Sequence, residues 1–269
     1  MSKKHVLLFL SFTILTLLSS ACISPNPSIV YHDVTSFLPP EQNYSISVYS
    51  KTGEKEYAFK NSLVINQETK TAELRTTTPD YSYHAYLNQD MQIVQGELRF
   101  FHPEQIEQLG YDRRFTVQDY DTNKVITQFS KYDQNSFRSD FEYDVNTVDV
   151  ESLPYYIQSI VTRGEDEFIG TLIDINSGKG YYVKMDIING DRLNRFIKRS
   201  KAPETIKDIL KNEDVTLYSI GMQGISRILV PYKYYVVLEN ETPHRIRIFW
   251  GESSKTYSFQ VYESFAETN

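Results

Sequence analysis

The chain of 269 residues is 40% hydrophobic and 14% aromatic, which suffices for one large or two small cored domains and excludes disorder over most of its length. Its 28 Lys and Arg residues against 35 Asp and Glu residues give a formal charge of -7, so no global positive field exists to attract nucleic acid. With 21 Tyr and 15 Phe residues against 11 Gly and 10 Pro, the composition favours a mainly β fold.

Residues 1–21 have the layout of a secretory signal peptide. Lys3 and Lys4 precede an apolar run from Val6 to Leu18, and small residues follow it at positions 19–21. The run is shorter than the roughly 20 predominantly apolar residues that a spanning helix needs, and Ser and Thr dilute it. We therefore expect this segment to be removed on export and not to remain as a transmembrane helix.

Cys22 follows the small residues and is the only cysteine of the chain. A solitary cysteine cannot form an intramolecular disulfide in the oxidising compartment to which a signal peptide leads. The segment Leu18-Ser19-Ser20-Ala21-Cys22 resembles the lipobox of bacterial lipoproteins, although Ser19 stands where Leu is commonest. The open alternative is an ordinary signal peptide, cut near Ala21, that leaves a free thiol.

The lipobox resemblance implies a diacylglycerol on Cys22, which then becomes the N-terminus of an exported protein anchored in the bacterial cell envelope. Because Ile23 and not Asp follows the cysteine, it also implies the outer membrane, if the organism has one. Residues 22–43 contain four prolines among Ser and Asn and are predicted to form an extended, Pro-rich tether. Loss of Lys3 and Lys4 would leave 26 basic against 35 acidic residues, a charge of -9.

From Tyr44 onward, apolar and polar residues alternate over short runs, which indicates strands with one buried face. The turns between them, such as Thr52-Gly53 and Asn88-Gln89-Asp90, are short enough for hairpins and too short for parallel crossovers. The pair Asn189-Gly190 predicts a further hairpin turn. Residues 44–269 are therefore expected to form a single antiparallel β domain that closes in a three-strand meander over residues 232–261.

Two stretches break the alternation. Between Asp149 and Val161 apolar residues recur at spacings of three and four, with Asp149 as a possible N-cap and Pro154 in the first turn. A shorter helix is predicted from Pro203 to Leu210. The expected fold is thus mainly β, a curved antiparallel sheet or unclosed β-barrel with one central helix and one short helix.

This order of elements, with the lipobox, the tether and the central segment Val150-Glu151-Ser152-Leu153-Pro154-Tyr155-Tyr156-Ile157, looks like the LolA/LolB-like envelope lipoproteins and related bacterial families of unknown function. The resemblance covers about residues 44–265 and contains no diagnostic motif. It implies a curved sheet, capped on its concave side by helices, that can enclose an apolar cavity. No functional residue can be carried over from it.

The sequence contains no recognisable catalytic or metal-binding motif. The histidines after the leader, His32, His84, His102 and His244, lack the spacing of metal ligands. No nucleophile elbow is present, and the acidic run Glu165–Glu167 beside Gly164 is typical of a solvated loop. We expect no enzyme activity, no cofactor and no metal.

An apolar pocket is predicted on the concave face of the sheet, beneath the helix that begins near Asp149. The alternating strands carry more aromatic surface than one thin helix could cover, although close packing is the alternative. The predicted lining residues are Tyr83, Leu98, Phe100, Phe168, Leu172, Tyr182, Ile248 and Trp250.

Residues 191–211 contain seven basic and three acidic residues in an otherwise acidic chain. This segment is the best candidate for facing anionic lipid headgroups or an acidic partner, and a solvated connection between a strand and a helix is the alternative. The candidate basic surface residues are Arg192, Arg195, Lys198, Arg199 and Lys201.

These patterns predict a lipid-anchored, non-enzymatic envelope protein that binds a hydrophobic or lipid-like ligand on the concave face of its sheet. The alternative function is a scaffold or assembly lipoprotein that binds another envelope protein through a sheet edge or its acidic surface. A hollow apolar core would favour the first function, and a filled core with an exposed patch would favour the second.

Overall fold

The computed structural model describes residues 38–119, 124–131, 138–144, 147–174, 179–211, 214–224, 233–252 and 257–265. All of them belong to one compact unit, residues 31–269. The expected signal peptide, Cys22 and most of the expected tether lie outside the described residues.

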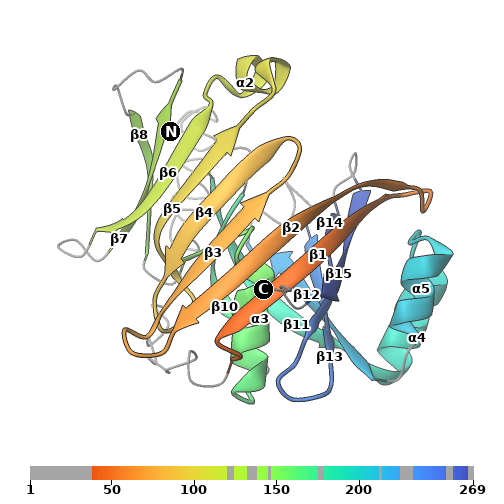
Figure 1. Ribbon diagram of the computed structural model, residues 1–269. Coiled ribbons are helices and arrows are strands. Elements are labelled where there is room, and N and C mark those ends of the chain that lie inside the picture. Colours follow the sequence, from red (N-terminus) through yellow and green to blue (C-terminus); the bar gives the residue numbers. More distant parts are fainter. Residues whose placement is uncertain are drawn as a thin grey trace, which may run out of the picture. The chain divides into compact units, whose positions relative to one another are not determined.

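The described strands form one fifteen-stranded sheet whose two halves meet in the middle (Figure 1). The first half comprises β1 (Glu41–Ser50), β2 (Lys55–Asn66), β3 (Thr71–Thr77), β4 (Tyr81–Leu87), β5 (Ile93–Phe100), β6 (Arg113–Asp119), β7 (Lys124–Ser130) and β8 (Arg138–Asp144). The second comprises β9 (Thr147–Asp149), β10 (Ile169–Ile173), β11 (Gly180–Ile188), β12 (Val215–Met222), β13 (Lys233–Glu239), β14 (Ile246–Glu252) and β15 (Tyr257–Ser264). The first strand begins at Glu41, three residues before the predicted start of the domain.

Within each half, strands that are consecutive in sequence are neighbours in the sheet, and antiparallel pairing of β1 with β15 joins the two halves. The predicted antiparallel sheet is confirmed, with one exception, the parallel pair β9 and β10. Strands β8 and β9 stand at opposite ends of the strand order, yet Asp144 and Thr147 are three residues apart in sequence. They are thus within about 11 Å, so the two sheet edges approach each other and the sheet is barrel-like.

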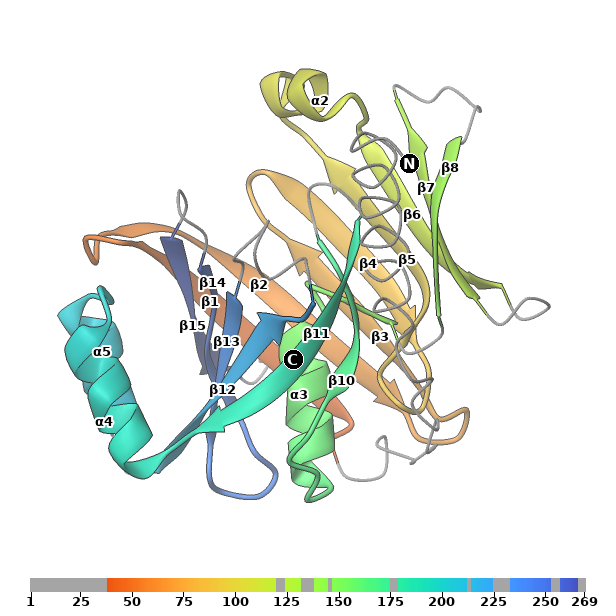
Figure 2. The ribbon, with the colours of Figure 1, turned by 180° about the vertical axis from the view of Figure 1, so that it is seen from behind.

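The predicted central helix is present as α3 (Leu153–Thr162), with Pro154 in its first turn. It lies on the concave side of the sheet, behind β1–β3 in Figure 1 and in front of them in Figure 2. Its residues from Leu153 to Ile160 are all buried, as befits a helix surrounded by sheet. Asp149 is not its N-cap, which is Ser152; Asp149 ends β9 instead.

The predicted second helix is α5 (Glu204–Leu210), preceded by Pro203. Two further helices were not predicted, α2 (Pro103–Leu109) and α4 (Gly190–Arg199). The hairpin predicted at Asn189-Gly190 is wrong, because Gly190 begins α4 there. Tertiary contacts decided this, since Leu193, Phe196 and Ile197 of α4 pack against the sheet.

Two hydrophobic clusters lie on opposite faces of the sheet. The larger fills the concave side around α3. The smaller lies between α4 and α5 and the outer face of β12–β15, where both helices are seen beside those strands (Figure 1). The outer face of β2–β6 has no helix over it in that view.

Candidate functional site

Five of the eight predicted pocket residues come together in the cluster around α3. Tyr83, Leu98, Phe100, Phe168 and Leu172 are each at most 3% exposed. Neighbouring side chains, and not open space, therefore surround them. The concave face at these residues is a packed core.

The other three predicted pocket residues face the opposite side of the sheet, so the prediction that they line the concave face is wrong. In β11, Val183 and Met185 belong to the cluster around α3, and Tyr182, which directly precedes Val183, must therefore point outward. Ile248 and Trp250 lie in the cluster beneath α4 and α5. A bulge in β14 causes this, because Leu238 pairs with Ile246 while Val237 pairs with Ile248. The extra residue turns Ile246 and Ile248 to opposite faces.

A buried ion pair links β6, the third strand from one edge of the sheet, to β9 at the other edge. The Arg114 Nη2 atom of β6 lies 2.6 Å from the Asp149 Oδ2 atom at the end of β9, and the two side chains are 1% and 0% exposed. Arg114 Nη1 also donates a hydrogen bond of 2.7 Å to the Asp174 carbonyl, which follows β10. Burial raises the pKa of the Asp149 carboxyl, and the neighbouring guanidinium opposes that rise.

Glu151 lies between this ion pair and the start of α3 and is a partly buried carboxyl with a perturbed pKa. The pKa of Glu151 is raised to about 7, because burial and the Asp149 carboxylate raise it more than Arg114 and a hydrogen bond of 2.9 Å donated by the Tyr81 hydroxyl lower it. Burial also raises the pKa values of Tyr81 and Tyr83. Such perturbation occurs at functional sites and in structural networks alike. Nothing in the sequence around Glu151 signals its burial, so no local pattern distinguishes it from a solvated carboxyl.

A cavity of about 470 Å³ lies at the C-terminal side of α3 and is polar, unlike the apolar pocket that was predicted. Gln158 Nε2 donates to Gln42 Oε1 at 2.9 Å and to the His244 carbonyl at 2.5 Å, and the Tyr44 hydroxyl donates to Gln42 Oε1 at 3.1 Å. The lining residues are Pro39, Glu41, Gln42, Asn43, Tyr44, Gln158, Pro243, Arg245, Ser264 and Phe265.

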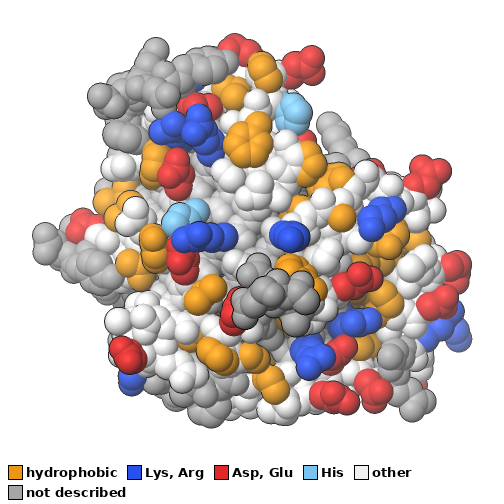
Figure 3. Space-filling model, viewed as in Figure 1, with side chains coloured by type: hydrophobic (Ala, Val, Ile, Leu, Met, Phe, Trp, Pro, Cys, Tyr) orange, Lys and Arg blue, Asp and Glu red, His pale blue; other side chains and the backbone are white. Residues whose placement is uncertain are grey.

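The outer face of β2–β6 carries the exposed apolar side chains of the described chain. Three of its large hydrophobic residues, Val64, Tyr86 and Val117, are 38–46% exposed, and Phe101 directly after β5 is 45% exposed. The strand registers place Val64, Glu73, Tyr86, Gln95 and Val117 opposite one another in a single row across five strands. We call these five residues the outer-face row. Figure 3, which looks onto this face, shows hydrophobic side chains scattered among charged ones.

Glu73 anchors a small charged network within the outer-face row. Its Oε1 atom accepts hydrogen bonds from Arg75 Nη2 and lies 2.6 Å from the Nε2 atom of His84. The hydrogen bond from Arg75 lowers the pKa of Glu73. The outer-face row therefore combines exposed apolar side chains with a carboxylate that is held in place by its neighbour Arg75. Apolar and polar groups side by side are typical of a surface that binds a protein.

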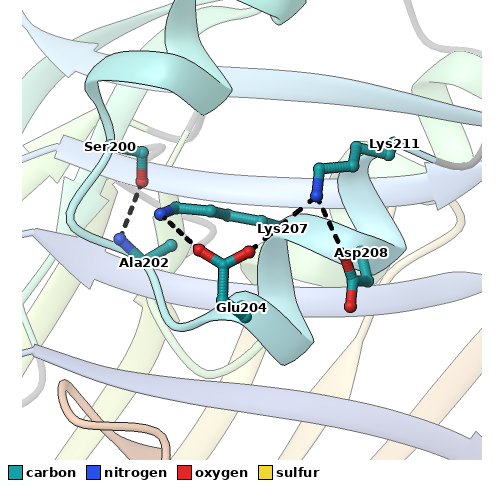
Figure 4. A network of polar contacts seen from close by, with 6 residues as sticks. All are labelled: Ser200, Ala202, Glu204, Lys207, Asp208 and Lys211. Atoms are coloured by element: carbon teal, nitrogen blue, oxygen red, sulfur yellow. Dashed lines mark hydrogen bonds and ion pairs between the residues drawn. The ribbon is translucent and has the colours of Figure 1, made fainter.

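The five predicted basic surface residues lie together, on α4 and directly after it. Arg192, Arg195, Lys198, Arg199 and Lys201 are all exposed. The acidic residues of the neighbouring α5 are engaged elsewhere, with Glu204 and Asp208 bound to Lys207 and Lys211 (Figure 4).

Within the described ranges, no group of three or more His, Cys, Asp or Glu residues could hold a metal ion. No described helix is both long and apolar enough to cross a bilayer.

No family model matches the chain, and no curated protein is significantly similar to it. Among solved structures it is similar to a β-barrel-like protein of the domain of unknown function DUF1849 from Brucella abortus. The two share 9% sequence identity with a TM-score of 0.44, over 84% of this chain and 97% of that one. The resemblance to LolA/LolB-like lipoproteins stays a prediction.

Proposed function

We propose that this chain is a lipid-anchored protein of the bacterial cell envelope that binds another envelope protein through the outer-face row of β2–β6. The observation that supports this proposal most is the position of the exposed hydrophobic residues. Val64, Tyr86 and Val117 occupy one row on the outer face of β2–β6, which no described helix covers in Figure 1, whereas α4 and α5 cover the outer face of β12–β15. Neighbouring strands lie about 4.8 Å apart, so the row extends over roughly 19 Å.

The competing function, transport of a hydrophobic ligand on the concave face, would require the packed cluster around α3 to open. Leu98, Leu172 and Ile157 in that cluster are at most 1% exposed. Separating such side chains would expose apolar area at a cost of about 25 cal/mol per Å². A filled core with an exposed apolar row favours the binding of a protein partner.

Photo-crosslinking from the outer-face row tests the partner. A photoreactive residue at position 86 or 117 in the full-length chain is expected to give a discrete crosslinked product in cells of the source organism. Tyr86→Ala should reduce the product formed from position 117 at least about tenfold, since exposed tyrosines are frequent energetic centres of interfaces. The melting temperature should stay unchanged because Tyr86 is exposed.

Ala58 supplies the matched control position. It is exposed on the same face of β2, six residues from Val64 and hence about 20 Å along the strand. A photoreactive residue at position 58 should give no discrete product. Equal products from positions 58 and 86 would mean random collisions and would remove the proposed interface.

The anchor has its own test. Labelling of the cells with a fatty acid analogue is expected to label the wild-type protein and to leave Cys22→Ser unlabelled, with loss of membrane association in the variant. We expect this result because the solitary cysteine directly follows a segment with the layout of a signal peptide. Persistent labelling of Cys22→Ser would place the anchor elsewhere, and an unlabelled wild-type protein would show that Cys22 carries no lipid.

A further inference from the structure

Helix α4 has two chemically opposite faces, and its packing fixes which of them is exposed. Leu193, Phe196 and Ile197 lie against the outer face of the sheet. The Phe196 ring is 5.3 Å from the Tyr235 ring and 6.3 Å from the Trp250 ring, centroid to centroid. The opposite face of the helix is therefore held toward solvent.

The exposed face of α4 is cationic. Arg192, Arg195, Lys198 and Arg199 occupy it and Lys201 follows directly, while Asp191 is the one acidic residue of residues 190–201. Among the described residues, none of the five cations forms an ion pair. Arg195 makes one polar contact, a hydrogen bond of 3.3 Å from Nε to the Asp191 carbonyl. We call these five residues the basic face.

The acidic residues of the neighbouring helix α5 are already engaged. On α5, Lys207 lies 2.9 Å from Glu204 and Lys211 lies 3.0 Å from Asp208 (Figure 4). The positive charge of the basic face is thus uncompensated, in a chain whose formal charge is -7. Uncompensated clustered charge attracts a partner of opposite charge.

We propose that the basic face docks the domain on the anionic phospholipid headgroups of the membrane that carries its anchor, an inference that rests on the lipid anchor proposed above. An acidic protein partner fits less well, because protein interfaces are built around apolar and aromatic cores. The exposed large hydrophobic residues of the described chain lie on the first half of the sheet, not on α4. A layer of anionic lipid headgroups, in contrast, can be bound through positive charge alone.

The anchor would keep α4 close to that surface. Sixteen residue steps separate Cys22 from the described Leu38, a reach of at most roughly 55 Å. The helix that carries the basic face lies over β12–β15, and the outer-face row crosses β2–β6, on the other half of the sheet (Figure 1). A domain docked through α4 would therefore leave the outer-face row open to a protein partner.

Vesicle binding tests the basic face without the anchor. The protein used is the chain from residue 22 onward with Cys22→Ser, which contains every described residue and carries no lipid. We expect it to sediment with vesicles of 30% phosphatidylglycerol in phosphatidylcholine, and not with pure phosphatidylcholine. Because the attraction is screened, binding should weaken steeply between 50 and 300 mM salt. Arg192→Gln/Lys198→Gln should weaken binding about 25-fold, since each cation near such a surface contributes about fivefold.

Lys55→Gln/Lys60→Gln is the control, because it removes the same charge from exposed positions on β2. It should change vesicle binding less than threefold, and all variants should keep the wild-type circular dichroism spectrum. Equal weakening by the two double variants, or no binding to phosphatidylglycerol, would overturn the proposal. So would competition by 10 mM inorganic phosphate, or tighter binding to polyglutamate than to the vesicles. Since the protein carries no lipid here, these outcomes do not depend on acylation of Cys22.

Discussion

Replacement of Arg114 by Met is expected to destabilise the domain by about 3–5 kcal/mol, because it leaves the Asp149 carboxylate buried without its cation. The two groups are 2.6 Å apart and at most 1% exposed, so water cannot take over the solvation of Asp149. The loss should be large for a second reason, since the pair joins β6 to β9 near the approaching edges of the sheet. For a domain of this size the melting temperature should fall by about 10 °C. Urea denaturation followed by circular dichroism measures the change in unfolding free energy.

Arg75→Met provides a matched control. Arg75 also lies 2.6 Å from a carboxylate, that of Glu73, but its side chain is 65% exposed. Exposed pairs of this kind contribute about 0–1 kcal/mol, so this substitution should have little effect. The double variant Arg114→Met/Asp149→Leu should recover much of the loss, because it removes both buried charges. A loss in Arg114→Met no greater than that in Arg75→Met would show that the buried pair does not support the fold.

Glu151→Gln is expected to stabilise the domain at high pH and to change little at low pH. The pKa of Glu151 is about 7 in the folded protein, against a usual value of 4.5. The folded state therefore binds more protons than the unfolded state between these values, and wild-type stability falls as the pH rises from about 4.5 to 7. A shift of this size corresponds to roughly 3 kcal/mol at pH 8. Gln stays neutral, and its carbonyl can still accept the hydrogen bond from the Tyr81 hydroxyl.

The measurement compares unfolding free energies of wild type and Glu151→Gln at several pH values between 4 and 8.5. The difference should be near zero at pH 4 and should grow up to about pH 7. Glu73→Gln is the control with the opposite sign, because the hydrogen bond from Arg75 lowers the pKa of Glu73. That variant should lose a little stability, and the loss should be present at pH 7 and disappear as the pH falls. A constant difference for Glu151→Gln across the range would mean that Glu151 does not titrate there.

Local signals in the sequence were sufficient for most strands and for the central helix. The two-residue alternation and the turns at Thr52-Gly53 and Asn88-Gln89-Asp90 reproduce the hairpins β1–β2 and β4–β5. The helix that became α3 and the closing meander β13–β15 were predicted as well. Each of these depends on contacts between residues close in sequence, which a pattern records directly.

The basic face could be predicted only in part from such local signals. Counting charges along the sequence was enough to locate all five cations, because their positions in the chain do not depend on how it folds. It could not show that four of them share one exposed helix face, since the same residues were predicted to follow a hairpin turn. The helix forms because its apolar side chains pack against strands β13 and β14, which follow about 40–60 residues later in the chain. Leu193, Phe196 and Ile197 share one cluster there with Tyr235, Ile248 and Trp250.

The sequence by itself therefore determined the composition of the domain, its antiparallel strands and its central helix, all of which follow from local periodicity and turn chemistry. The tertiary structure alone decided which face each strand buries, as the bulge in β14 shows by separating Ile246 from Ile248. It also decided that Arg114 meets Asp149, that Glu151 is partly buried, and that Val64, Tyr86 and Val117 align. These features depend on contacts between residues far apart in the chain, and their energies arise from burial and register that no local pattern encodes.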